Sequence, residues 1–247
     1  MVNIKFLGVG SDLEKNPTSI LINEKDSYLL LDATPSIFSQ LSQEEISNID
    51  MVFISHSHAA HFIGLPMLIA YYCFIKKRKR ALTVFIQKKN INKLKNLLKI
   101  MYNINITSLP FNLNFIELRA NLNFKFDIFD FYVGRTMHTV DNHFLKIYVK
   151  EKSLLYTGDG KYIHSYLKPY EYTDIILQNI LSFNKKNEYA MNLKDSIKFY
   201  SQFDYIKEIY FLHLLDYKQE VLNEYVSKLK DLKFKIHFPK DNDIITL

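Results

Sequence analysis

The sequence is poor in glycine, proline and cysteine. Its 247 residues include six glycines, six prolines and one cysteine, Cys73. So few turn-forming residues argue against disorder and against long low-complexity linkers. A lone cysteine excludes an internal disulfide and fits a reducing compartment. We therefore expect one folded domain over residues 1–247, located in the cytoplasm.

Long apolar runs are also missing. The segment Leu65–Ile75 is about half of the roughly 20 residues that a membrane-spanning helix needs, and basic residues follow it. The first ten residues, MVNIKFLGVG, lack a basic head followed by an apolar run, so we expect no signal peptide. A membrane is therefore not among the expected partners.

Apolar residues make up 48% of the chain, which is enough for a sizeable core, and the net charge is +6. The positive charge favours anionic partners such as nucleotides, nucleic acid or phosphate esters, although a solvated lysine-rich surface explains it equally well. The densest basic run is KKRKR, residues 76–80. Its position between two apolar segments favours a basic turn over a nucleic-acid patch.

The pattern of apolar residues predicts an α/β protein in which helices cover sheets. The last predicted helix places Val221, Tyr225, Leu229 and Leu232 on one face. Strands are expected within residues 3–10, 19–35 (two strands), 51–56, 82–87, 114–119, 124–134, 144–159, 174–180 and 208–214, and helices at 63–75, 90–102, 192–203 and 218–232.

Histidines gather in one short segment, although the chain holds only eight of them. Three fall within the six residues HSHAAH, and three further polar residues each follow a predicted strand. Side chains at strand ends converge on one rim of a rigid sheet. Imidazole and carboxylate groups gathered there suit zinc, manganese or iron. The candidate ligands are His56, His58, His61, His138, Asp159 and His213.

The spacing inside HSHAAH is consistent with two ions. Positions 56 and 58 project to one side of an extended segment, and position 61 comes from the start of the next helix, where it can face a second ion. Taken singly, each of these residues is most simply a structural histidine or a turn aspartate. A barrel hydrolase with a His-x-His motif needs eight strand–helix units, which the strand-rich first half does not supply.

Taken in order, the pieces HSHAAH, His138, YTGD with Asp159, and FLH with His213 resemble the metallo-β-lactamase fold family. The opening strands and Asp32 also resemble the start of that fold, so the resemblance runs from about residue 3 to about residue 216. It implies a four-layer αββα sandwich. The detail SHSHAAHFIGLP is most similar to the phosphodiesterase branch, which includes the tRNA 3′-end endonuclease tRNase Z and cyclic-nucleotide phosphodiesterases.

The resemblance also implies roles for the ligands and a cofactor of two divalent ions, zinc or manganese. His56, His58 and His138 would hold the first ion, His61 and His213 the second, and Asp159 would bridge both. The family motif is His-x-His-x-Asp-His, in which the carboxylate binds the second ion and handles the proton of the attacking water. In this sequence Ala60 stands in its place.

Ala60 can neither bind a metal nor accept a proton. Loss of a positioned acid–base group lowers a rate by about 10²- to 10⁴-fold, and a weakened second metal site would add to that loss. Two explanations are open: an introduced change that traps substrate, or a natural loss of catalysis. Because the other ligand positions are intact, we favour the introduced change.

Two divalent ions suit the in-line displacement of a phosphodiester, although relatives also hydrolyse lactams and thioesters. The basic chain, the HFIGLP continuation and the turn LGVGS favour the phosphodiester. Ser11 in that turn and His143 are candidate substrate contacts. Asp159 and His213 are candidate catalytic residues, and His213 or His143 is a candidate donor of the leaving oxygen's proton.

The substrate is expected to be small. Bacterial tRNase Z enzymes carry a tRNA-gripping arm between their third and fourth motifs, whereas 20 residues separate His138 from Asp159 here. Gln178 and Asn179 also stand where those enzymes have a His-Glu motif. We therefore expect hydrolysis of a 3′,5′-cyclic mononucleotide, with RNA cleavage or catalytically dead nucleotide binding as alternatives. The resemblance further implies a homodimer.

Overall fold

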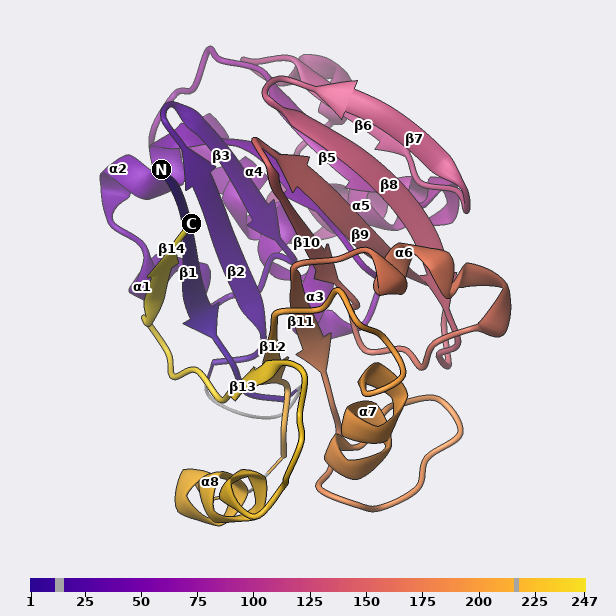
Figure 1. The fold of residues 1–247 in the computed structure, drawn as a ribbon. Helices are drawn as coiled ribbons and strands as arrows, with labels where there is room; N and C mark the ends of the chain where they lie inside the picture. Colours follow the sequence, from indigo (N-terminus) through magenta and orange to yellow (C-terminus); the bar gives the residue numbers. More distant parts are fainter. Residues whose placement is uncertain (12–15, 216–217) are drawn as a thin grey trace.

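Two seven-stranded sheets form the centre of the computed structural model, which describes residues 1–11, 16–215 and 218–247 (Figure 1). The first sheet has the strand order β14-β1-β2-β3-β4-β5-β6, with parallel pairing from β3 to β6. Its strands are β1 (Val2–Gly8), β2 (Ser19–Glu24), β3 (Ser27–Leu31), β4 (Ile49–Phe53), β5 (Leu82–Ile86), β6 (Leu113–Glu117) and β14 (Ile244–Thr246).

The second sheet has the order β13-β12-β11-β10-β9-β8-β7, and its strands β10 to β13 run parallel. An antiparallel hairpin joins β9 to β10. Its strands are β7 (Leu122–Phe126), β8 (Phe129–Thr136), β9 (Asn142–Val149), β10 (Lys152–Tyr156), β11 (Ile175–Asn179), β12 (Glu208–Leu212) and β13 (Lys235–His237).

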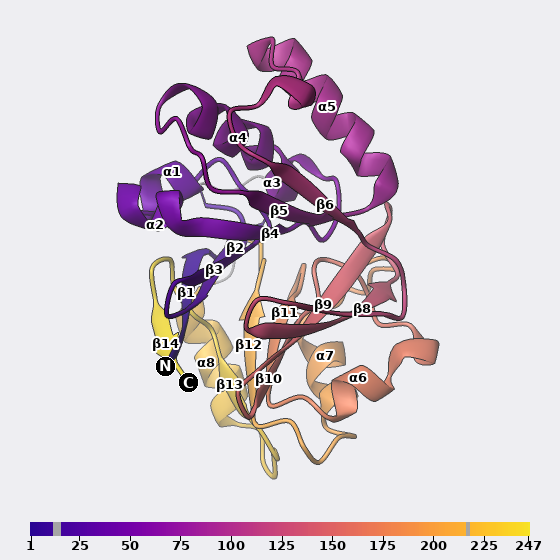
Figure 2. The ribbon, with the colours of Figure 1, turned by 90° about the horizontal axis from the view of Figure 1, so that it is seen from above.

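The helices lie on the two outer faces of this sheet pair (Figure 2). One face carries α1 (Ile37–Gln40), α2 (Gln43–Asn48), α3 (Ala59–Phe62), α4 (Gly64–Phe74) and α5 (Lys88–Tyr102). The other carries α6 (Lys168–Glu171), α7 (Leu193–Tyr200) and α8 (Gln219–Ser227). Short 3₁₀ turns occur at Ile106–Ser108 and His164–Tyr166.

Three apolar layers separate these four layers of secondary structure. Residues such as Phe6, Phe53 and Tyr156 fill the space between the sheets. A second cluster packs α4 and α5 on the first sheet, and a third packs α7 on the second sheet. This arrangement confirms the expected αββα sandwich, because each sheet buries one face against its partner and the other beneath helices.

The sequence pattern was incomplete at the C-terminal end. The helix predicted over residues 218–232 ends at Ser227. Of its predicted apolar face, Tyr225, Leu229 and Leu232 pack against the outer cluster, whereas Val221 is 49% exposed and Leu222 is buried instead. The short strands β13 and β14 were not predicted, because three residues are too few to show a period. β14 pairs with β1, which brings the two ends of the chain side by side (Figure 1).

The basic run at residues 76–80 is a structural turn, as expected. Arg78 is 6% exposed and donates to the carbonyl oxygens of Ser47 and Ala81. Both Arg78 and Arg80 form ion pairs with Asp50. Among the described helices, none is long and apolar enough to cross a bilayer.

Candidate metal centre

The structure brings the six candidate ligands together at the C-terminal ends of strands from both sheets. His56 and His58 follow β4, and His61 lies in α3. From the second sheet, His138 follows β8, and two further ligands, Asp159 and His213, follow β10 and β12. Their donor atoms form two groups, each within 4.8 Å, which share Asp159 and could each hold a metal ion.

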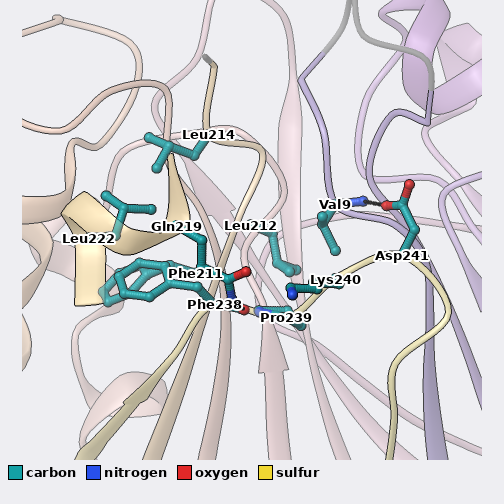
Figure 3. Close-up of a pocket in the computed structure, with 10 residues that line it drawn as sticks. All are labelled: Val9, Phe211, Leu212, Leu214, Gln219, Leu222, Phe238, Pro239, Lys240 and Asp241. Atoms are coloured by element: carbon teal, nitrogen blue, oxygen red, sulfur yellow. Dashed lines mark hydrogen bonds between the residues drawn. The ribbon is translucent and has the colours of Figure 1, made fainter. Parts of the chain in front are cut away.

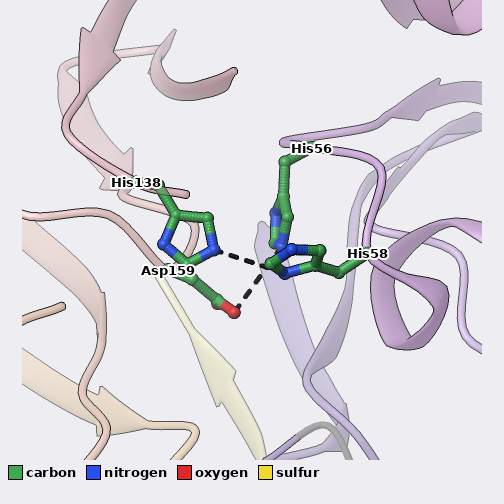
Figure 4. A group of neighbouring side chains, drawn as sticks. All are labelled: His56, His58, His138 and Asp159. Carbon is green, nitrogen blue, oxygen red and sulfur yellow. Dashed lines mark hydrogen bonds and ion pairs between the residues drawn. The ribbon is translucent and has the colours of Figure 1, made fainter. Parts of the chain in front are cut away.

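The first group contains His56, His58, His138 and Asp159 (Figure 4). His138 Nε2 lies 3.3 Å from His58 Nδ1, and His56 Nε2 lies 3.7 Å from Asp159 Oδ2. Donors at about 2.0–2.1 Å from a tetrahedral zinc ion are roughly 3.3 Å apart. The spacing of these four donors therefore fits a single bound ion.

The second group contains His61, Asp159 and His213. The Nε2 atoms of both histidines lie 3.2 Å from Asp159 Oδ2. The same carboxylate oxygen thus faces both groups. This group has three donors, because the residue that precedes His61 is Ala60, which is buried in α3 with 7% exposure.

Asp32 orients the imidazoles of two candidate ligands, His61 directly and His56 through Ser55. It is fully buried and accepts hydrogen bonds from His61 Nδ1, Ser55 Oγ and Tyr156 OH, each at 2.7 Å. Since the Ser55 hydroxyl donates to Asp32, its contact of 2.9 Å with His56 must be a bond that His56 Nδ1 donates. Both imidazoles therefore carry their proton on Nδ1 and present an Nε2 lone pair, the form a metal needs.

Burial acts on His56, and neighbouring histidines act on Asp159, to keep both groups in the form that a metal ligand needs. Desolvation, reinforced by the neighbouring His61, holds the pKa of His56 well below its ordinary value, so the imidazole is neutral. His56 Nε2 is buried and makes no hydrogen bond within the described residues, as expected of a metal donor. Burial alone would raise the pKa of Asp159, but His213 and His61 hold that pKa well below its usual range.

Left-handed backbone conformations position two of the site residues. His213 has φ +63° and its N–H donates to the carbonyl oxygen of Val9 at 2.8 Å. Gly158, beside Asp159, has φ +58°, and a Cβ there would lie 2.6 Å from Asn142 Oδ1. A side chain at position 158 would therefore displace the loop that presents the shared carboxylate.

A pocket of about 230 Å³ opens above the ligands. Asn179 lines it and donates to Asp159 Oδ1 at 2.7 Å, while His138 Nδ1 donates to the carbonyl oxygen of Tyr189 at 3.0 Å. The irregular segment 180–190 supplies much of the wall. The lining residues are His58, His138, Thr139, Asp159, Asn179, Ile180, Leu181, Asn187, Tyr189, Ala190 and His213.

Sequence reasoning did not identify this wall, because segment 180–190 lacks a motif. Asn179 was noted only as a departure from the tRNase Z pattern.

The two predicted substrate contacts lie elsewhere. Ser11 is 3% exposed and does not line this pocket. His143 projects from β9 into a different pocket, where its Nδ1 meets Gln87 Nε2 at 3.1 Å. The structure therefore does not bring His143 together with the metal ligands.

The buried position of His143 predicts a pH-dependent stability. Burial lowers its pKa to about 4, so below pH 6.5 the unfolded chain binds a proton that the folded chain excludes. Its contribution to the free energy of unfolding is complete above pH 6.5 and falls as the pH drops toward 4. Between pH 7 and pH 5 the expected loss is about 2 kcal/mol.

Urea unfolding of His143→Asn at both pH values measures this term, since the Asn oxygen can still accept from Gln87. The loss on acidification should be about 2 kcal/mol smaller than in the parent chain. The matched control is His164→Asn at an exposed position. An unchanged acid sensitivity in His143→Asn would disprove the prediction.

Another pocket, of about 420 Å³, lies beside β12 (Figure 3). Leu212 and Leu214, the neighbours of His213, line it together with Phe211, Leu222 and Phe238. Its wall contains none of the metal-ligand candidates, and Asp241 at its edge accepts a hydrogen bond from the Val9 N–H at 3.1 Å. Of these two pockets, the smaller one is therefore the one lined by candidate metal ligands.

Known proteins resemble this chain in structure and, over part of its length, in sequence. The structure of YhfI from Bacillus subtilis, a metallo-β-lactamase fold protein, superimposes with a TM-score of 0.80 over 99% of this chain and 98% of that chain, at 15% identity. Ribonuclease Z of Methanosarcina mazei is 34% identical over 34% of this chain, and ribonuclease Z of Picrophilus torridus is 30% identical over 62%. The chain spans only 29% and 48% of the lengths of these two relatives.

The fold and the His/Asp cluster define a metallo-β-lactamase-fold protein whose lineage is that of metal-dependent hydrolases in the phosphodiesterase and tRNase Z branch. Within that class, a family model matches residues 2–233. The chain belongs to the family described as Anti-Pycsar protein Apyc1.

Proposed function

We propose that this protein is a binuclear-metal phosphodiesterase of small 3′,5′-cyclic mononucleotides, and that Ala60 cripples the present form. The observation that carries the proposal is the pair of donor groups that share Asp159 Oδ2 at the mouth of one small pocket. Removal of a cyclic-nucleotide signal is the biological role that such an activity would serve.

The proposed ligand assignment follows the two donor groups. His56, His58 and His138 would hold one zinc or manganese ion, His61 and His213 the other, and Asp159 would bridge them. Bound there, the two ions would supply Lewis acidity and activate a water molecule for attack on phosphorus.

The chain's own residues orient this centre and its substrate. Asn179 holds the Asp159 carboxylate through Oδ1, which leaves Oδ2 directed at the histidines. Ile180 and Leu181 provide an apolar wall that excludes water. Tyr189, which is 38% exposed at the pocket, offers an aromatic face on which a base could stack.

The size of the pocket supports a small substrate. Its volume of about 230 Å³ lies below the range of about 300–1,000 Å³ for drug-sized ligands. An adjoining pocket of about 280 Å³ shares Leu181 and Asn187 with it and adds Lys185. The chain between His138 and Asp159 is occupied by the β9–β10 hairpin, which leaves no length for an RNA-gripping arm.

RNA cleavage is the second candidate, because the curated relatives are named ribonuclease Z. An RNA end would enter the same pocket, and a homodimer could supply further contacts from a second copy. Pure nucleotide binding is the third candidate, since Ala60 leaves the pocket without its acid–base carboxylate.

A substrate panel separates these candidates. The Ala60→Asp protein and the chain as it stands are each loaded with zinc or manganese and offered 3′,5′-cyclic mononucleotides and a precursor tRNA. The proposal expects cleavage of at least one cyclic mononucleotide by Ala60→Asp and little by the present chain. Cleavage of the tRNA alone would favour the ribonuclease, and binding without cleavage by either protein would favour a binding protein.

A further inference from the structure

The pocket that His143 lines, of about 540 Å³, lies where the first turn of α5 meets the segment between β6 and β7. It adjoins the metal centre through the loop that carries the histidines. The His143 N–H donates to the Ser55 carbonyl oxygen at 3.0 Å, and Lys93 Nζ donates to Ser57 Oγ at 2.8 Å. Its wall consists of Gln87, Lys88, Lys89, Asn92, Glu117, Leu118, Arg119, Ala120, Arg135, Asp141 and His143.

The start of α5 faces this pocket without a cap. The helix has 15 residues, and its N-cap residue Gln87 makes no side-chain cap hydrogen bond. The Asn90 N–H donates to the Gln87 carbonyl oxygen at 2.8 Å, which leaves the N–H groups of Lys88 and Lys89 as the end of the helix. The first N–H groups of a helix have no partner within the helix, and the helix dipole places partial positive charge on them. Lys88 and Lys89, the first two residues of the helix, both line the pocket, so this end offers donors to an anion.

His143 is a second feature of this pocket that points to an anion, and it is independent of the helix end. It is 4% exposed, yet it lines the same pocket. Gln87 Oε1 accepts from Asn90 Nδ2 at 2.7 Å and Gln87 Nε2 donates to the Ser55 carbonyl oxygen at 2.7 Å, which fixes the orientation of the amide. The Gln87 amide must then also donate to His143 Nδ1.

A neutral His143 that accepts at Nδ1 carries its proton on Nε2. Within the described residues no hydrogen bond engages that Nε2–H. His143 Nε2 is not among the fully buried unpaired atoms of the described residues, so this donor is accessible from the pocket that His143 lines, and an anion there could accept its hydrogen bond.

The wall of this pocket carries more positive than negative side chains, which favours an anionic ligand. Lys88 and Arg119 form no ion pair within the described part of the chain, whereas Lys89 and Arg135 both pair with Asp141. Four cationic side chains thus stand against the carboxylates of Asp141 and Glu117. The two unpaired cations remain available to a ligand.

We propose that this pocket binds a phosphate dianion, either inorganic phosphate or the phosphate group of a nucleoside monophosphate, through the α5 N-terminus, the His143 Nε2–H, Lys88 and Arg119. Such a group has the charge and the acceptor oxygens that these donors need. This pocket shares no lining residue with the pocket at the candidate metal centre. The inference concerns binding, so it does not rest on the proposed hydrolysis.

Calorimetric titration of the metal-loaded full chain with inorganic phosphate, and separately with a nucleoside 5′-monophosphate, tests the proposal. The variant Lys88→Gln/Arg119→Gln should weaken phosphate binding on the order of tenfold or more, because two charge-assisted contacts are lost. The control Lys79→Gln/Lys95→Gln removes the same charge from exposed positions outside the pocket and should retain the affinity.

A local signal separates this pocket from the metal centre. The Nε2–H resonance of His143 should shift on addition of phosphate in the parent chain and in His138→Ala, and should stay unchanged in Lys88→Gln/Arg119→Gln. Tighter binding of the nucleotide than of inorganic phosphate would identify the nucleotide as the ligand, and equal affinities would identify the phosphate group alone. Equal weakening in both double variants, or no shift of the His143 signal, would overturn the proposal.

Discussion

Replacing Ala60 by aspartate is expected to raise the rate of cyclic-nucleotide hydrolysis by about 10²- to 10⁴-fold. Ala60 lies next to His61 in α3, so a carboxylate there would join the group of three donors formed by His61, Asp159 and His213. It would add the fourth ligand that a tetrahedral site requires. It would also provide a proton acceptor that the described pocket wall lacks, apart from its metal-ligand candidates.

The metal content provides a second measurement of the same change. After dialysis, the present chain should retain one equivalent of zinc more firmly than the second, because one donor group has four members and the other three. Ala60→Asp should retain two equivalents. The matched control is Ala59→Asp, which places the same carboxylate one residue away at an exposed position. The explanation fails if Ala59→Asp gains as much activity or metal as Ala60→Asp.

Replacing Asp32 by alanine is expected to lower the free energy of unfolding by about 3–5 kcal/mol. The carboxylate is fully buried and accepts from His61, Tyr156 and both the backbone and the hydroxyl of Ser55. Its removal leaves these donors unpaired in the interior. Asp32 also has φ +56°, a conformation that alanine adopts less readily than aspartate or asparagine.

Two further variants separate these effects in urea unfolding and zinc titration. Asparagine adopts the backbone conformation of Asp32 as readily, but its NH₂ group would face hydrogen-bond donors that the carboxylate now accepts from. The affinity for zinc should therefore fall by about 10- to 100-fold in Asp32→Asn. Asp130→Ala removes an exposed carboxylate that pairs with the exposed Lys125 and should change stability by less than about 0.5 kcal/mol. A comparable cost for Asp32→Ala and Asp130→Ala would show that the buried network contributes little.

The sequence was sufficient to predict which residues converge. Histidine and aspartate side chains just after apolar runs are informative, because the run predicts a buried strand and the strand end fixes where the side chain lies. The αββα layering followed from the same runs together with the family resemblance. Neither conclusion depended on the exact ends of the elements.

The position of His143 shows where such reasoning stops. Adjacent residues of a strand point to opposite faces, and β9 begins at Asn142. Asn142 turns toward the loop of Asp159 and donates to the Thr157 carbonyl oxygen at 3.0 Å, whereas His143 turns toward Gln87. A shift of one residue in register would exchange the two side chains, and the sequence pattern does not fix the register.

The pocket wall and part of the buried face of the last helix were missed for related reasons. Segment 180–190 takes its shape from tertiary contacts, such as the bond from His138 to the Tyr189 carbonyl oxygen, and has no period of its own. In α8 an apolar residue occurs at both 221 and 222, so the pattern alone leaves two possible buried faces. The packing of Leu222 in the outer cluster selects one of them.

The origin of the ligands from two different sheets has a mechanical consequence. His56, His58 and His61 belong to the first sheet, and His138, Asp159 and His213 to the second. An ion held by both sets would link the two sheets, and separation of the sheets would require its release. Its binding free energy would therefore stabilise the whole fold rather than one loop. This stabilisation would not require a carboxylate at position 60, because the first donor group does not include that position.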